Sequence, residues 1–165
     1  MEMKHEYVLV ALDYNEWADQ VALEAEQRLP QDVLRAKQPM GFGAVFETLV
    51  HMMDSQRVWL RRWQDVSPAP FSTLANYATL DQLETAWEAL HAEFRVFVAG
   101  SELERPITYT TTQGETYTHP LGLLLWHILN HGVEHRSELS AIFTQAGYQL
   151  ARMDFITYLR TVARF

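Results

Sequence analysis

Residues Pro120 to Gly147 read PLGLLLWHILNHGVEHRSELSAIFTQAG, an apolar run in which three histidines stand four residues apart. Four residues make about one turn of an α-helix, so the imidazoles of His127, His131 and His135 follow one side of a predicted helix. At about 100° per residue, His131 and His135 fall within the apolar stripe of that helix, whereas His127 lies at its margin. The stretch therefore predicts a core-facing helix with imidazoles where aliphatic side chains are expected.

Imidazoles on a core-facing stripe need polar partners, because a buried nitrogen without a hydrogen bond costs free energy. One interpretation is that each histidine is an ordinary core or edge residue with its own hydrogen bonds. The other is that a metal ion binds them together. Two histidines in an HxxxH pattern are a weak signal, and the glutamate-containing HExxH pattern does not occur here. The metal interpretation therefore requires a third ligand from elsewhere in the chain.

The composition bounds the fold and the partners. The 165 residues, 48% of them hydrophobic, suit a single domain over residues 1–165 with a sizeable core. A net charge of −8 disfavours nucleic acid and anionic membranes as partners. Without cysteine, any metal must be held by nitrogen and oxygen donors. The N-terminal residues resemble neither a signal peptide nor a membrane anchor, so a cytoplasmic location is expected.

Apolar residues at helical spacing predict three more long helices, from about residue 5 to Leu29, over residues 44–63, and over residues 80–99 after a capping box at Thr79. The segment from Pro30 to Pro39 is expected to be a loop. Residues 65–80, DVSPAPFSTLANYATL, contain prolines and polar residues that mark a long connection, and their length lets the chain cross a bundle. Asp154 is expected to cap a short C-terminal helix.

Two local features complete the fold prediction. Residues 106–118 carry β-branched and aromatic residues around a Gln113-Gly114 pair, which predicts a short β-hairpin before the last long helix. Thr118 is expected to cap that helix, with Pro120 in its first turn and Gly147 at its end. The sequence thus predicts an all-α four-helix bundle with a long crossover connection, a short β-hairpin and a short C-terminal helix.

His51 lies at the margin of the apolar arc of the second predicted helix. Placed opposite His131 and His135 in a bundle, it could complete a site of three nitrogens. Three basic residues follow on the same helix, Arg57, Arg61 and Arg62, and are expected to line its solvated face.

Four segments together resemble the DinB-like (DinB/YfiT) superfamily of four-helix-bundle proteins. These segments are DYNEWAD, FETLVHMMDSQRVWLRRW, LLLWHILNHGVEHRSEL and MDFITYLR, and they span almost the whole chain. The NHxxxHR core is the most specific of these matches. The resemblance implies a four-helix bundle with a long crossover that holds a divalent ion such as zinc or nickel and is often dimeric.

The resemblance also implies which residues surround such an ion. The metal ligands of the family fall on His51, His131 and His135. Relatives often have HHRGQ where this chain has EHRSE over residues 134–138, so substrate preference does not transfer directly. Residues next to the ligands that could contact them are His127, Asn130, Glu134 and Glu138.

The leading functional hypothesis is a divalent-metal-dependent enzyme whose three-histidine site is open to water or substrate. Some relatives resemble transferases or isomerases that use low-molecular-weight thiols, so the expected reactions are a thiol-dependent transfer or a hydrolysis on a small molecule. The alternative is a metal-stabilised structural or small-ligand-binding bundle without catalysis. The family resemblance and the five tryptophans also lead us to expect a homodimer.

Overall fold

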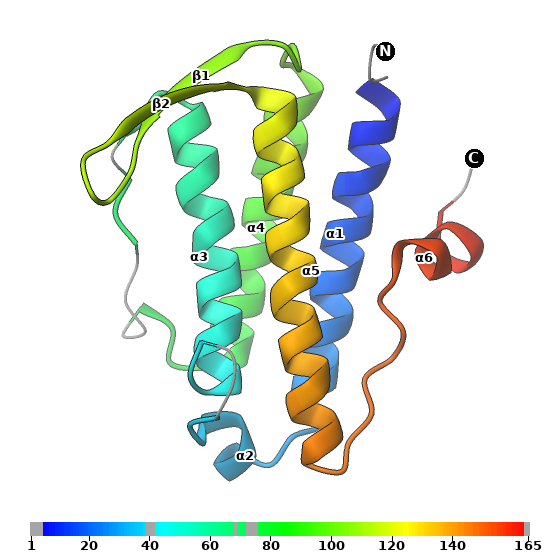
Figure 1. Cartoon of the computed structure of the whole chain (residues 1–165). Helices are drawn as coiled ribbons and strands as arrows, with labels where there is room; N and C mark the ends of the chain where they lie inside the picture. Colours follow the sequence, from blue (N-terminus) through cyan, green and yellow to red (C-terminus); the bar gives the residue numbers. More distant parts are fainter. Residues whose placement is uncertain (1–4, 39–41, 68, 72–75, 164–165) are drawn as a thin grey trace.

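The structure is a computed structural model that describes residues 5–38, 42–67, 69–71 and 76–163. Pro39 therefore lies outside the described residues. Four long helices run along one common direction (Figure 1). They are α1 (His5–Glu26), α3 (Val45–Trp63), α4 (Leu80–Ala99) and α5 (Leu121–Gln145).

Each long helix packs against two others. The neighbouring pairs are α1 with α5, α5 with α3, α3 with α4, and α4 with α1. Helices α3 and α4 point the same way, so the chain must return from one end of the bundle to the other between Trp63 and Leu80 (Figure 1). The predicted four-helix bundle with a long crossover is confirmed.

The predicted hairpin is formed by β1 (Pro106–Thr110) and β2 (Thr116–Pro120), which pair antiparallel across the end of the bundle (Figure 1). β1 contacts α3 and β2 contacts α5, and Ile107 is buried beneath the hairpin. The prediction that Thr118 caps the last long helix is wrong. Thr118 pairs with Thr108 inside the hairpin, and their hydroxyl oxygens lie 2.9 Å apart.

Helix α5 begins directly after Pro120, which has no side-chain capping hydrogen bond. The first backbone N–H groups of the helix donate instead to backbone carbonyls of the preceding segment. Leu121 donates to Arg105 at 2.9 Å and Gly122 to Leu103 at 2.8 Å. These bonds satisfy donors that every helix start leaves free. At the other end, Gly147 has a φ of 83°, which glycine adopts without strain.

The segment after α1 differs from the prediction. The helix ends at Glu26, three residues before Leu29, and α2 (Gln31–Arg35) occupies part of the expected loop. Pro30 precedes the first turn of α2 with a φ of −58°, a value that suits a helix start. Leu34 is buried on its inner side. A helix of five residues is too short to show an apolar repeat in the sequence.

The C-terminal segment returns along α1 and forms α6 (Phe155–Thr161) (Figure 1). The Asp154 side chain accepts a hydrogen bond from the Thr157 backbone at 3.0 Å, so the predicted cap is confirmed. Tyr158 packs against Tyr14 of α1, whose hydroxyl donates to the Met153 carbonyl. Among the described residues, no helix has the length and apolar character needed to cross a membrane.

Candidate metal centre

Three histidine rings meet on the seam between α3 and α5. His51 comes from the middle of α3, and His131 and His135 from successive turns of α5. The ring centroids lie 4.5–5.1 Å apart, and one nitrogen from each ring lies within 4.8 Å of those of the other two. The structure thus brings together the three residues predicted as metal ligands, in a cluster that could hold a metal ion.

Glu138 orients the ring of His135. The Nδ1 atom of His135 lies 2.7 Å from Oε2 of Glu138, one turn further along α5. A carboxylate accepts hydrogen bonds, so Nδ1 carries the proton and Nε2 keeps its lone pair. Carboxylates commonly fix metal-binding histidines in this way. Glu138, predicted as a neighbour of the ligands, therefore prepares His135 to donate through Nε2.

Burial keeps two of the rings neutral. The pKa of His51 falls from its ordinary value of 6.5 to about 4, first because the ring is partly buried and then because the charge of His135 opposes protonation. The pKa of His131 falls to about 3 through burial and the neighbouring histidines. Neutral imidazoles have a free lone pair, so both rings are ready to bind a metal ion at neutral pH.

Two phenylalanines stack beside His51. The ring of Phe42 lies 3.9 Å from the imidazole at an interplanar angle of 10°, and the ring of Phe71 lies 6.5 Å away at 14°. Both phenylalanines are exposed and belong to the connections before and after α3. Neither residue could be predicted from periodicity, because a single aromatic residue in a connection has no repeat. Their position beside glycines and prolines near a histidine-bearing helix was the only available signal.

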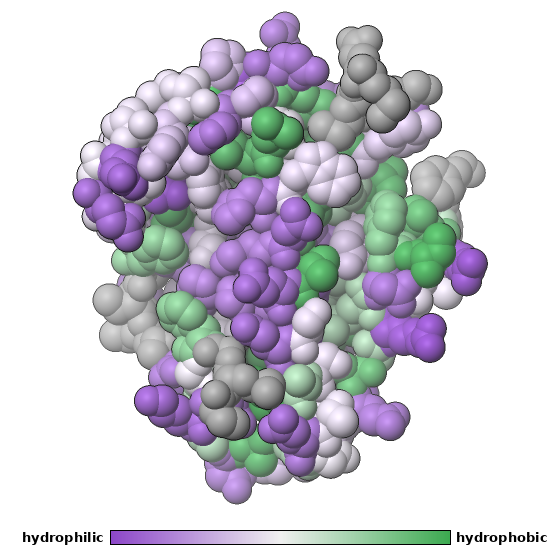
Figure 2. All heavy atoms as spheres, in the orientation of Figure 1, coloured by the Kyte–Doolittle hydropathy of each residue, from purple (hydrophilic) through white to green (hydrophobic). Residues whose placement is uncertain are grey.

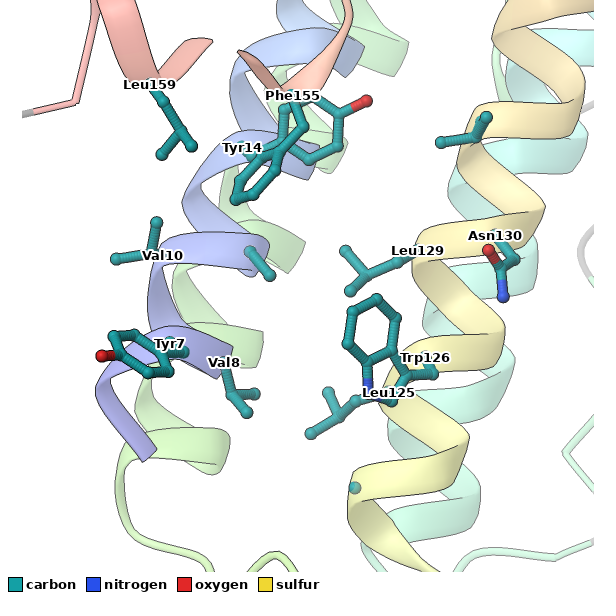
Figure 3. A pocket seen from close by; sticks show the side chains of 13 residues that line it. Tyr7, Val8, Val10, Tyr14, Leu125, Trp126, Leu129, Asn130, Phe155 and Leu159 are labelled. Carbon is teal, nitrogen blue, oxygen red and sulfur yellow. The ribbon is translucent and has the colours of Figure 1, made fainter. Parts of the chain in front are cut away.

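The three other candidates lie around the cluster and not in it. His127 is one turn before His131, with its ring centroid 6.0 Å from that of His131 and 5.0 Å from that of Trp59. Glu134 is exposed and its charge acts on His127. Asn130 is exposed at the edge of a separate apolar groove between α1 and α5 (Figure 3). Of the four neighbours considered, Glu138 has direct hydrogen-bond contact with a proposed ligand.

The cluster reaches the surface of the bundle. His51 and His131 are partly exposed, whereas His135 is 8% exposed. Figure 2 shows hydrophilic side chains gathered in the middle of this face, over α3 and α5. A small molecule can therefore approach the histidines from solvent.

A buried polar network lies behind the histidines. Asp19 of α1 is fully buried and accepts hydrogen bonds from Asn15, Gln56 and Arg136. Nε2 of His91 lies 3.4 Å from Asp19, although the two are not aligned for a hydrogen bond. His91 thus faces the interior of the bundle. Arg136 directly follows His135, so the network also fixes the α5 backbone beside the cluster.

Two comparisons with known proteins agree with this architecture. The model of the DinB family matches residues 1–163. The chain belongs to the DinB family. It is also similar to Protein DinB of Bacillus subtilis (strain 168), with 24% identity over 155 residues that cover 89% of this chain and 90% of that protein.

The family segments recognised in the sequence contact one another in this DinB protein. Asp19 closes the DYNEWAD segment, and Arg136 closes the NHxxxHR core. Their side chains form a buried ion pair. One half of the motif therefore holds α5 against α1, while its histidines face α3.

The donor set fits a divalent ion with nitrogen ligands. Zinc binds imidazole at about 2.0–2.1 Å, which places ligand nitrogens roughly 3.3 Å apart in a tetrahedral site. The three nitrogens lie within 4.8 Å of one another, so a bound ion would draw the side chains closer together. Three neutral protein ligands also leave a coordination position for another molecule.

Proposed function

We propose that this DinB protein is a divalent-metal-dependent enzyme in which His51, His131 and His135 hold zinc or nickel and leave a position open to water or substrate. The proposed reactions are a transfer that uses a low-molecular-weight thiol or a hydrolysis of a small molecule. The observation that carries the proposal is the convergence of three imidazole nitrogens at a solvent-accessible seam, with Glu138 fixing one of the rings.

The side chains of the site have separable roles in this proposal. His51 and His131 stay neutral because they are partly buried, so protons compete poorly with a metal ion at pH 7. Glu138 fixes the tautomer of His135. Phe42 covers one face of His51 and excludes water from it. When bound, a divalent ion at three neutral ligands lowers the pKa of a water or thiol in the open position.

A purely structural role for the metal is less well supported. Helices α1, α3 and α5 are already joined behind the histidines, because Asp19 accepts hydrogen bonds from Gln56 and Arg136. Gln56 also accepts a hydrogen bond from the Trp87 indole of α4 at 3.1 Å. The network links all four helices without a metal ion. A metal at the seam is therefore available for chemistry and is not needed to hold α3 to α5.

A turnover assay tests the proposal. Protein purified without an affinity tag would be stripped of metal, reloaded with zinc or nickel, and assayed for thiol conjugation with 1-chloro-2,4-dinitrobenzene and for hydrolysis of p-nitrophenyl acetate. We expect turnover of at least one substrate to depend on the metal and to be lost in the His51→Ala variant. The His127→Ala variant is the matched control, since it removes an imidazole from the same face but outside the cluster.

The turnover assay, together with the melting temperature of each metal form, distinguishes the catalytic proposal from the structural or ligand-binding alternative. If neither substrate turns over in any metal form and the metal only raises the melting temperature, the metal-stabilised structural or ligand-binding role is the correct one. Zinc and nickel are distinguished by elemental analysis of the untreated protein. The cytoplasmic location and the lack of a nucleic-acid partner stay predictions.

The homodimer expected from the sequence has a suitable surface in the apolar groove between α1, α5 and α6. The groove has a volume of about 480 Å³. Side chains of α5 point across it towards α1, and Phe155 of α6 lies beside Tyr14 (Figure 3). Leu123 and Trp126 are exposed on the adjoining turns of α5. In the proposed dimer, a two-fold axis would place the exposed apolar side chains of each copy against the groove of the other.

Analytical ultracentrifugation tests this dimer. We expect the wild type to sediment as a dimer at micromolar concentration and the Trp126→Glu variant to sediment as a monomer, because the charge would be buried in the interface. Val96→Glu is the control, since Val96 is 76% exposed on α4, which does not border the groove. A wild type that stays monomeric at all concentrations would remove the proposal.

A further inference from the structure

Arg62 is a buried cation without an anion. The residue is 6% exposed on α3, although the sequence analysis expected it on a solvated face. Its guanidinium lies over the ring of Trp59, 4.6 Å from the centroid, and 5.6 Å from that of Tyr109. Among the described residues, no carboxylate lies within ion-pair distance, and Nε is buried without a hydrogen-bond partner.

The other arginines nearby are paired. Arg57 forms an ion pair with Asp54 at 2.6 Å, and Arg61 forms one with Glu93 at 3.4 Å. Arg136, which is as deeply buried as Arg62, has Asp19. Withdrawal of a guanidinium from water without a counter-ion costs free energy, so buried charges in proteins are normally paired. Arg62 is the exception on this seam.

An aromatic strip connects Arg62 to the metal centre. The Trp59 ring contacts His127 edge to face, with centroids 5.0 Å apart, and the ring of His127 lies 6.0 Å from that of His131. On the other side, Trp59 contacts Tyr109 of the hairpin at 4.9 Å. His127 is exposed, so a molecule bound at the histidines can extend over this strip towards the hairpin.

The helix geometry sets the length of such a molecule. Arg62 follows His51 by eleven residues on α3, which is about 16 Å of helix. The guanidinium of Arg62 lies over the ring of Trp59, three residues earlier on α3, so the longer side chain of Arg62 brings its charge back along the helix towards His51.

We propose that Arg62 binds a carboxylate of the molecule on which the metal centre acts, and that this molecule is an elongated small acid with its reacting group at the histidines. Trp59 covers one face of the guanidinium and Nε is enclosed, so the Nη1–Nη2 edge is the one left for a ligand. That edge matches the two oxygens of a carboxylate. The inference rests on the proposed function and adds the substrate class.

A matched pair of thiols tests the inference through binding, without turnover. Protein loaded with cobalt(II) would be titrated with 6-mercaptohexanoate and with 6-mercaptohexanol, which differ in the carboxylate alone. The near-ultraviolet absorption of a cobalt-bound thiolate reports binding at the metal. We expect the wild type to bind the acid about tenfold or more tightly than the alcohol, because a charge-assisted hydrogen-bond pair adds to the thiolate contact.

Variants of Arg62 and of its neighbour Arg61 show which residue causes the preference for the acid over the alcohol. Arg62→Gln is expected to lose the preference for the acid and to bind the alcohol as the wild type does. Arg62→Lys keeps the positive charge but lacks the two-nitrogen edge of a guanidinium, so it should retain part of the preference for the acid. Arg61→Gln is the control for net charge, since Arg61 is partly exposed and paired with Glu93. If Arg62→Gln does not fold, the comparison of Arg62→Lys with the wild type still tests the carboxylate site.

The outcomes separate the two proposals. Equal affinity of the wild type for acid and alcohol would overturn the carboxylate site and leave the metal-thiol proposal intact. If neither thiol perturbs the cobalt spectrum, the thiol reaction is wrong. The carboxylate site is then decided by titration of metal-free protein with hexanoate, followed by tryptophan fluorescence. A saturable change that Arg62→Gln abolishes supports the site, and no such change overturns it.

Discussion

Replacement of His51, His131 or His135 by alanine is expected to weaken zinc binding by more than about 100-fold, whereas His127→Ala weakens it by less than about tenfold. Each of the three converging rings would donate a coordinate bond, and the fourth lies beside the cluster against Trp59. Glu138→Gln should fall between these limits, because loss of an outer hydrogen-bond partner typically costs about 10- to 100-fold in metal affinity. Isothermal titration of metal-free protein with zinc measures all five variants.

The four histidine variants test the choice of ligands and not merely the presence of a site. All four side chains lie on the α3–α5 face, so a general loss of stability would affect them alike. Far-ultraviolet circular dichroism before each titration separates folding from binding. Retained binding in His135→Ala together with lost binding in His127→Ala would move the centre one turn along α5, towards the hairpin.

The helical spacing of apolar residues in the sequence predicted the long helices of this fold. The long helices follow apolar stripes of ten residues or more, and the resulting boundaries differ by up to three residues from those observed. The histidines could be placed for the same reason, since four-residue spacing on a helix fixes their relative direction. His51 was a candidate third ligand because it lies at the margin of the apolar arc of its own helix. The family resemblance implied the same residue, and this was needed because no spacing within one helix can show which residue of another helix lies opposite.

Features that depend on a single tertiary contact could not be predicted in this way. The start of α5 is set by the backbone carbonyls of Leu103 and Arg105, and the sequence carries no signal for those bonds. Arg62 belongs to a basic cluster that looks solvated until the hairpin places Tyr109 over it. Phe42 meets His51 only because the loop before α3 folds back on that helix.

The buried network around Asp19 was only partly visible in the sequence. Asn15 and Asp19 belong to the DYNEWAD segment that carries part of the family resemblance, but their contact was not predicted. The amide of Asn15 donates to Asp19 at 3.0 Å. Gly132 allows this contact, because a Cβ there would lie 2.6 Å from Oδ1 of Asn15 and 2.7 Å from Nη1 of Arg136. A glycine in mid-helix costs about 1 kcal/mol relative to alanine. The close approach of α1 and α5 offsets that cost.

Asp19→Ala is expected to lower the free energy of unfolding by about 3–5 kcal/mol, because it leaves the Arg136 guanidinium buried without a counter-ion. Nη1 of Arg136 would keep the Asn15 amide oxygen as an acceptor at 3.0 Å, but Nη2 has no partner among the described residues and no carboxylate would remain to balance the charge. The matched control is Asp13→Ala, which breaks a partly exposed pair with Arg95 and should cost at most about 1 kcal/mol. Urea unfolding curves of the metal-free variants, all recorded at the same protein concentration, give both values.

The pH dependence of the same measurement identifies the ionised form of Asp19 as the stabilising one. Burial raises the pKa of Asp19, but the charges of Arg136 and His91 and the amide of Gln56 outweigh it, so the pKa lies below the ordinary 3.8. A carboxyl with a lowered pKa stabilises the folded state above its unfolded pKa, and this contribution disappears as the pH falls below about 4. The difference between wild type and Asp19→Ala should therefore be constant between pH 6 and 8 and shrink in acid. A difference that grows in acid would mean that Asp19 is protonated in the native state and that Arg136 relies on another partner.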